Sequence, residues 1–268
     1  MAEEPTRALV APLPPLDEVA WESALADARD ALANLSVRRA GGGPFRVTDH
    51  EVRLALSTDG GAADDRDPFA WSARTARRAL GLAALRALVA GESRSPLDAV
   101  RARVAEIARL VQDGSPSVSG FDRWLAGLPP AGRAAVGAGA VTWVTRLWCA
   151  LDWRALGPDP VIGRDRWWDS PHSALLALRS RAEVRAGSGS LVVLTGPRRT
   201  SIRSELSLVT LVESLRSTDG ARPGRVIGWW PDSGHWVRVD PEPTVLTLGT
   251  EAVAQVLAGS GGTIRAAA

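Results

Sequence analysis

The sequence of 268 residues contains no lysine and no tyrosine, a single cysteine (Cys149) and a single asparagine (Asn34). Without lysine, the chain cannot use a lysine side chain as a nucleophile, to form a Schiff base or to bind a phosphate. One cysteine excludes an intramolecular disulfide and a cysteine-based zinc cluster. Lys, Tyr and Asn have AT-rich codons, whereas Ala, Gly, Arg, Pro and Trp are abundant, so a GC-rich genome explains this composition.

Long apolar runs are also missing. No segment reaches the roughly 18 to 20 apolar residues of a membrane-spanning helix, and the first five residues lack the basic-then-apolar plan of a signal peptide. The composition, 45% hydrophobic and 23% charged, is that of an ordinary soluble protein. We therefore expect a cytoplasmic protein without a membrane partner.

The charge is nearly balanced overall but uneven along the chain. A formal net charge of +2 argues against strong nonspecific nucleic-acid binding by the whole molecule. Residues 1–100 hold 12 arginines against 15 carboxylates, whereas residues 166–203 hold seven arginines against Asp169 and Glu183. The basic excess therefore lies in the C-terminal part of the chain.

Helical patterns fill the first 155 or so residues. Apolar spacing and capping residues predict helices over about 16–35, 48–56, 72–90, 95–111, 121–128 and 131–151. Val19, Leu25, Ala28 and Leu32 are expected on one face of the first, and the long last helix is expected to be largely buried. Prolines and glycines near residue 160 then mark a change of pattern.

The C-terminal part alternates strands and helices. Apolar runs at 174–178, continuing to about 185, and at 191–194 flank a Gly-Ser turn and predict a hairpin. A helix over 201–216 follows, then strands over 225–230, 235–240 and 245–248 and a helix over 250–257. The sequence thus predicts an α/β (α+β) protein, in which a mainly helical region, 1–165, packs on a small mixed-sheet domain, 166–268.

The order of these elements around Arg181-Ala182-Glu183-Val184 resembles the nuclease domain of RecB-type exonucleases, within the PD-(D/E)XK nuclease superfamily. Over roughly 80 residues, Glu183 falls at the family's first acid, Leu191 to Gly196 resembles its second strand, and 205–215 resembles the following helix. The resemblance implies a fold that holds nucleic acid. It also implies a Mg²⁺ site built from carboxylates, beside a lysine that helps to activate water.

The sequence departs from that catalytic set. Val192, Val193 and Leu194 occupy the positions of the second acid and the lysine, and an arginine cannot replace the lysine as a base. One acid alone is a poor site for a hard cation. We therefore expect a degenerate active site without catalytic residues and without a cofactor. An active nuclease with a rearranged site of Glu183, Glu205 and Asp169, using Mg²⁺, remains the last alternative.

Several side chains suit nucleic-acid binding. Arg181, Arg185, Arg198, Arg199 and Arg203 could contact phosphates, and the loop before the 201–216 helix could add backbone N–H groups; the other interpretation of that loop is a solvated turn with Thr200 or Ser201 as helix cap. Trp229 and Trp230 point to opposite sides of a strand, so one is expected in the core and the other could stack on a base.

The remaining reactive side chains indicate no catalytic site. His50, His172 and His235 are scattered, and Asp169 with His172 is the only close acid–histidine pair near the proposed core. Cys149 lies in an apolar helix and is expected to be buried. Three functions follow in order: a non-catalytic nucleic-acid-binding or accessory protein with a DNA or RNA partner, a protein-interaction subunit, and the rearranged nuclease.

Overall fold

The computed structural model describes residues 4–35, 45–56, 71–171, 176–194, 202–217, 221–230 and 233–259. The chain divides into two compact units. One comprises Met1–Thr6 and Asp67–Ile162, and the other comprises Arg7–Arg66 and Gly163–Ala268; helix α1 (Glu4–Val10) spans the first boundary. The expected division at residue 165 differs from this one, because residues 7–66 belong with the C-terminal half.

The first unit is helical and contains α4 (Ala73–Val89), α5 (Pro96–Gln112), α6 (Gly120–Gly127), α7 (Pro130–Ala150) and the short strand β2 (Val161–Ile162). Serines begin three of these helices: Ser72, Ser95 and Ser119 each accept a hydrogen bond from a backbone N–H three residues later. Such caps satisfy N–H groups that the first helical turn leaves unpaired. The helix starts at 72 and 95 that the sequence predicts are confirmed.

Helix α7 packs through one face only. Val136, Ala140, Val144 and Leu147 are buried, whereas Cys149 near its end is exposed. The expectations of a largely buried helix and a buried cysteine are therefore wrong. Alanine is common on both buried and exposed helix surfaces, so an alanine-rich helix gives little periodic signal.

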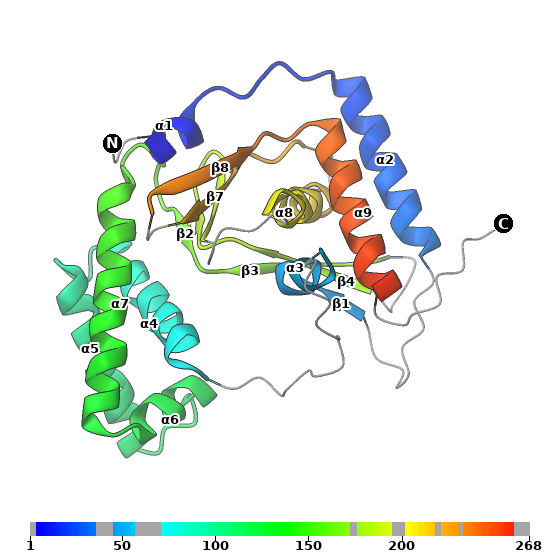
Figure 1. Cartoon of the computed structure of the whole chain (residues 1–268). Helices are drawn as coiled ribbons and strands as arrows, with labels where there is room; N and C mark the ends of the chain where they lie inside the picture. The colour runs from blue at the N-terminus through cyan, green and yellow to red at the C-terminus, as the bar shows by residue number, and fades with distance from the viewer. Residues whose placement is uncertain are drawn as a thin grey trace. The chain divides into compact units, whose positions relative to one another are not determined.

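The second unit contains two sheets and the helices that cover them (Figure 1). In the smaller sheet, β4 (Leu176–Arg181) lies between β1 (Phe45–Val47), which is parallel to it, and β3 (Asp165–Asp169), which is antiparallel. In the larger sheet, the strands of this unit run in the order β5 (Val184–Arg185), β6 (Leu191–Leu194), β7 (Val226–Trp230), β8 (His235–Val239). β5 and β6 are antiparallel, β6 and β7 parallel, and β7 and β8 antiparallel.

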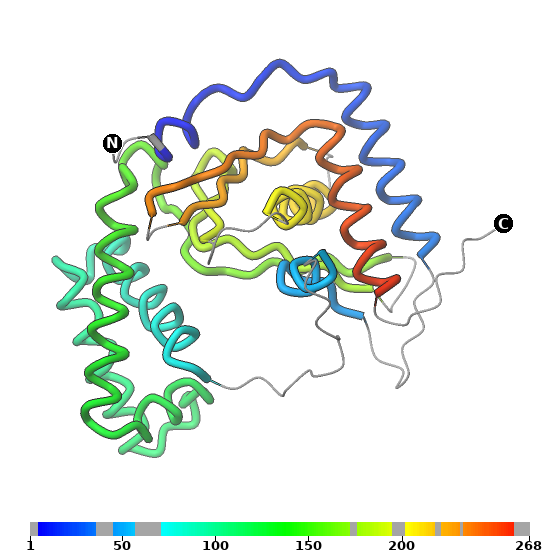
Figure 2. Tube along the Cα trace, viewed as in Figure 1, coloured from blue at the N-terminus to red at the C-terminus, as the bar shows by residue number. Residues whose placement is uncertain are grey.

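Helix α8 (Ile202–Arg216) connects β6 to β7 and is central to this unit. Figures 1 and 2 show it end-on, with β7 and β8 on one side and β3 and β4 on the other. Almost all of its residues are buried, including Glu205, Thr210 and Glu213. The predicted order of β6, α8 and β7 is therefore present, and the α/β fold class is confirmed. The predicted hairpin forms only between β5 and β6, because β4 pairs with β1 and β3 in the smaller sheet.

Helices α2 (Glu18–Asn34), α3 (Asp49–Leu56) and α9 (Pro243–Gly259) complete the core of this unit. Trp21 joins Leu25, Ala28 and Leu32 on the buried face of α2, whereas Val19 is 77% exposed, against expectation. At Gly249 of α9 an added Cβ would lie 2.8 Å from the Ser207 carbonyl oxygen of α8, so only glycine permits this close helix packing.

Residues 245–248 lie inside α9, so the predicted strand there is wrong. A short aliphatic run fits either a strand or a buried helix by pattern alone. Pro243 at the first position is the helix-start signal that this prediction overlooked.

Candidate functional site

The arginines of β3, β4 and β5 pair with carboxylates of the same unit, and Arg185 is the most buried of them. Arg185 donates two hydrogen bonds to Glu213 of α8, at 2.9 and 2.8 Å, in the paired geometry that suits a guanidinium and a carboxylate. Arg166 reaches the same carboxylate at 3.3 Å. Glu213 is 7% exposed, so the pair is largely removed from water. Arg185, predicted to contact phosphate, is engaged inside the unit.

Asp49, at the start of α3, is the centre of a second group of charges. Its two oxygens lie 2.9 Å from the Arg179 guanidinium and 3.7 Å from that of Arg181, and Arg179 also lies 3.5 Å from Asp165. The Trp167 ring lies beside this group, 5.8 Å from the Arg179 guanidinium carbon. These ion pairs connect α3 to β3 and β4.

The pKa values follow from this packing. Burial acts to raise the pKa of Asp49, but the nearby charges of Arg181 and Arg179 outweigh it and hold that pKa below its ordinary value. Burial likewise acts to lower the pKa of Arg181, but Glu183 and Asp49 outweigh it and raise that pKa. Both partners therefore stay charged.

Glu183, at the position of the first metal-binding acid in the resemblance, is fully buried. One of its oxygens accepts a hydrogen bond from the Leu194 backbone N–H at 2.6 Å, and the other accepts one from Arg181 at 3.5 Å. Glu205 is also buried, whereas Asp169 is exposed at the end of β3. Across the described ranges, no three His, Cys, Asp or Glu side chains group as a metal ion would require.

Trp229 and Trp230 are both buried, 3% and 5% exposed, so the expectation that one of them faces solvent is wrong. Strand β7 pairs with a neighbour on each edge and is covered on both faces, which removes the alternation on which that expectation rested. The Trp230 ring lies 5.0 Å from the ring of His235.

Arg203, in the first turn of α8, is the one predicted phosphate contact that the described residues show at the surface. Arg198, Arg199 and His172 lie outside them, and so does the Asp169–His172 pair. Arg203 lines an open groove of about 200 Å³ that holds charges of both signs, together with Ser207 and the apolar Leu248; its other charged groups are Arg238, Asp240 and Glu242. Arg238 lies 3.6 Å from Asp240, so the groove is not a basic surface.

Arg225 is an internal arginine that the sequence does not mark as functional. It is 2% exposed and bonds to Asp240 and to the carbonyl groups of Ala8, Ala11 and Pro12. It precedes a buried strand, but no local sequence signal distinguishes it from a surface arginine.

Comparisons with family models, curated proteins and solved structures found no match to this chain. The relation to RecB-type nucleases therefore stays a prediction based on element order. In the part of the chain that the structure describes, no helix is long and apolar enough to cross a membrane.

Proposed function

We propose that the protein is a non-catalytic accessory protein, which uses a nuclease-like α/β arrangement to hold a partner macromolecule. The state of Glu183 supports this proposal. Its oxygens already accept hydrogen bonds from Leu194 and Arg181, and the adjacent strand offers the aliphatic residues 192–194 where a nuclease needs further ligands. A hard cation requires several free oxygen ligands.

Of the two classes of partner, a polypeptide is favoured over nucleic acid. The observation that carries this choice is the inward pairing of Arg166, Arg179, Arg181 and Arg185 with carboxylates. Nucleic-acid affinity depends on cations that neutralise phosphates from the protein surface. Arginines already bonded to buried acids would have to break those pairs first.

The groove beside Arg203 suits a polypeptide better than a phosphate backbone. It presents Arg203 and Arg238 with Asp240 and Glu242, and an exposed Leu248. A polypeptide can complement both signs of charge and cover the leucine, whereas a nucleic acid would bring phosphates against Glu242. Strand β8 is an edge strand of its sheet and contributes to one wall of the groove. Edge strands are common sites of peptide addition.

Nucleic-acid binding remains a second candidate because of one feature. Arg203 is exposed in the first turn of α8, and Arg198 and Arg199 precede that helix closely in the sequence. The positive end of a helix, together with arginines, favours phosphate.

Crosslinking distinguishes a polypeptide partner from a nucleic-acid partner. A photoreactive amino acid replaces Leu248, 43% exposed, in the protein expressed in its native host, and the same substitution at Leu97, 42% exposed in the helical unit, is the matched control. We expect a polypeptide adduct at position 248 and none at 97. Adducts to nucleic acid at 248, or no adduct there, would overturn the polypeptide proposal.

Binding and cleavage assays complete the test. We expect labelled DNA and RNA to bind no tighter than about 100 µM at physiological salt. Tight binding that weakens steeply with salt and is lost in Arg203→Glu would establish the nucleic-acid candidate instead. Cleavage with Mg²⁺ or Mn²⁺ that disappears in Glu183→Gln would refute the non-catalytic proposal.

A further inference from the structure

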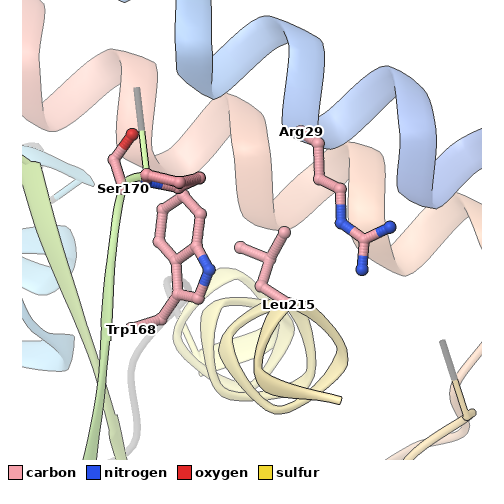
Figure 3. Close-up of a pocket in the computed structure, with 5 residues that line it drawn as sticks. Arg29, Trp168, Ser170 and Leu215 are labelled. Atoms are coloured by element: carbon pink, nitrogen blue, oxygen red, sulfur yellow. The ribbon is translucent and has the colours of Figure 1, made fainter. Parts of the chain in front are cut away.

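A cavity of about 150 Å³ lies in the second unit between α2, the end of β3 and the last turn of α8. It is lined by Arg29, Trp168, Ser170, Pro171 and Leu215. Figure 3 shows Arg29 on one side of this cavity and Ser170 on the other, with Trp168 and Leu215 between them. None of these residues belongs to the ion-pair groups or to the groove beside Arg203, so the cavity is independent of the proposed function.

The middle of the cavity is apolar. Leu215 is 6% exposed and belongs to the core of the unit, and Trp168 packs against the same core. A cavity of about this size with apolar walls admits a six-membered ring such as benzene. The indole offers a flat face, which favours offset stacking with an aromatic ring.

The two ends of the cavity are polar in different ways. Ser170 is 7% exposed, and its Oγ is buried without a hydrogen-bond partner, although its backbone N–H is held by the Leu176 carbonyl at 3.0 Å. A buried hydroxyl without a partner is rare and calls for a water or a ligand. At the other end, Arg29 lies on the exposed side of α2, and no carboxylate among the described residues pairs with it.

We propose that this cavity binds a small aromatic acid that carries a hydrogen-bonding group opposite its carboxylate. The ring would lie against Trp168 and Leu215, the carboxylate would pair with Arg29 at the open end, and the opposite hydroxyl would bond to Ser170 Oγ. A guanidinium matches a carboxylate in charge and shape. The ligand class is therefore a hydroxylated aromatic acid, for which 4-hydroxybenzoate is a suitable probe.

Calorimetry and saturation-transfer NMR on the full chain test the site with three probes: 4-hydroxybenzoate, benzoate and phenol. We expect 4-hydroxybenzoate to bind in the millimolar range or tighter. Loss of either polar group should weaken binding about tenfold, as expected for one hydrogen bond or ion pair in a partly buried site. Equal affinity for all three probes, or no binding of any, would overturn the proposal.

Two variants assign the ends of the ligand. Ser170→Ala should abolish the preference for 4-hydroxybenzoate over benzoate and leave its preference over phenol. Arg29→Gln, at an exposed position of α2, should abolish the preference for 4-hydroxybenzoate over phenol and leave its preference over benzoate. If both variants keep the wild-type order of affinities while their circular dichroism is unchanged, the probes bind elsewhere and the inference fails.

Discussion

Asp49 shares its charge between two arginines of β4, which are 130 and 132 residues away in the sequence. Taking a carboxylate and two guanidinium groups out of water is costly, and their attraction offsets that cost only while all of them are charged. The pKa of Asp49 stays below its ordinary value for this reason. Removal of this one acid would leave Arg179 and Arg181 underpaired in a mainly buried setting.

Asp49→Asn is therefore expected to lower the free energy of unfolding by about 3 kcal/mol, the lower end of the range for a broken buried pair. Because the folded-state pKa of Asp49 is depressed, its contribution is complete above the unfolded-state pKa of about 3.9 and is lost as the pH falls through the folded-state value. Urea unfolding at pH 7 and at acidic pH measures both effects.

The wild-type protein should therefore lose more stability than Asp49→Asn on acidification below about pH 4. Asp113→Asn is the matched control, because its partner Arg109 is 65% exposed and an exposed pair contributes about 0.5 kcal/mol. Equal losses of unfolding free energy in Asp49→Asn and Asp113→Asn at pH 7 would contradict a stabilising role for the buried Asp49 ion pairs.

The exposure of Cys149 can be tested by its reactivity. Its thiol is exposed at the end of α7, so we expect one equivalent to react with a thiol reagent in the native protein at the rate of the unfolded chain, within about tenfold. Cys149→Ser should give no reaction. A thiol that reacts only after unfolding would return the cysteine to the buried position expected from sequence.

Glycines in the helices illustrate how elements approach each other. In α4, a Cβ added at Gly81 would lie 2.5 Å from Cε3 of Trp143 in α7, whereas one added at Gly137 in α7 would meet no atom within 4 Å. Both glycines lie inside helices, where alanine is intrinsically better by roughly 0.5 to 1 kcal/mol. Whether a Gly→Ala substitution raises or lowers the free energy of unfolding should therefore depend on the packing around the added Cβ.

Gly81→Ala is expected to destabilise the helical unit by about 1 to 3 kcal/mol, because Trp143 would have to move within a packed interface. Gly137→Ala is expected to stabilise the same unit by about 0.5 to 1 kcal/mol. Thermal or urea unfolding of the two variants beside the wild type measures the difference. A change of the same sign in the free energy of unfolding of both variants would show that α4 and α7 do not meet at Gly81.

Across the whole chain, elements with a strong local sequence pattern could be predicted, whereas elements that depend on pairing with distant residues could not. Serine caps and apolar spacing predicted the helices that begin after Ser72 and Ser95. The order of β6, α8 and β7 was also predictable, because each element has its own local pattern of apolar residues. Strand β1 has only three residues and pairs with β4, far along the chain, so no local pattern marked it.

The candidate site was less predictable than the fold. Seven arginines between 166 and 203 suggested a basic surface, but charge counted along the sequence does not show which acids face them in space. Asp49 and Glu213, which neutralise Arg181 and Arg185, lie outside that window. The burial of both Trp229 and Trp230 also depends on neighbours that strand alternation cannot reveal.

The helical unit interrupts the α/β unit in the sequence, and this arrangement gives a test by fragments. The core of the second unit combines residues from both of its segments, and seven come from the segment before the interruption: Trp21, Leu25, Ala28, Leu32, Phe45, Val47 and Val52. Residues 166–268 alone would therefore expose the matching apolar faces of β4, α8 and α9, and burial of apolar area is the main term that stabilises a domain.

We expect a fragment of residues 166–268 to lack a cooperative unfolding transition, although it holds strands β4 to β8. Residues 7–66 joined to 163–268 by a long flexible linker should restore that transition, because the chain then contains the whole core. Residues 67–162 alone should unfold cooperatively with a helical circular dichroism spectrum. If residues 166–268 fold by themselves, the first 66 residues are an accessory layer, and the C-terminal segment is a domain in its own right.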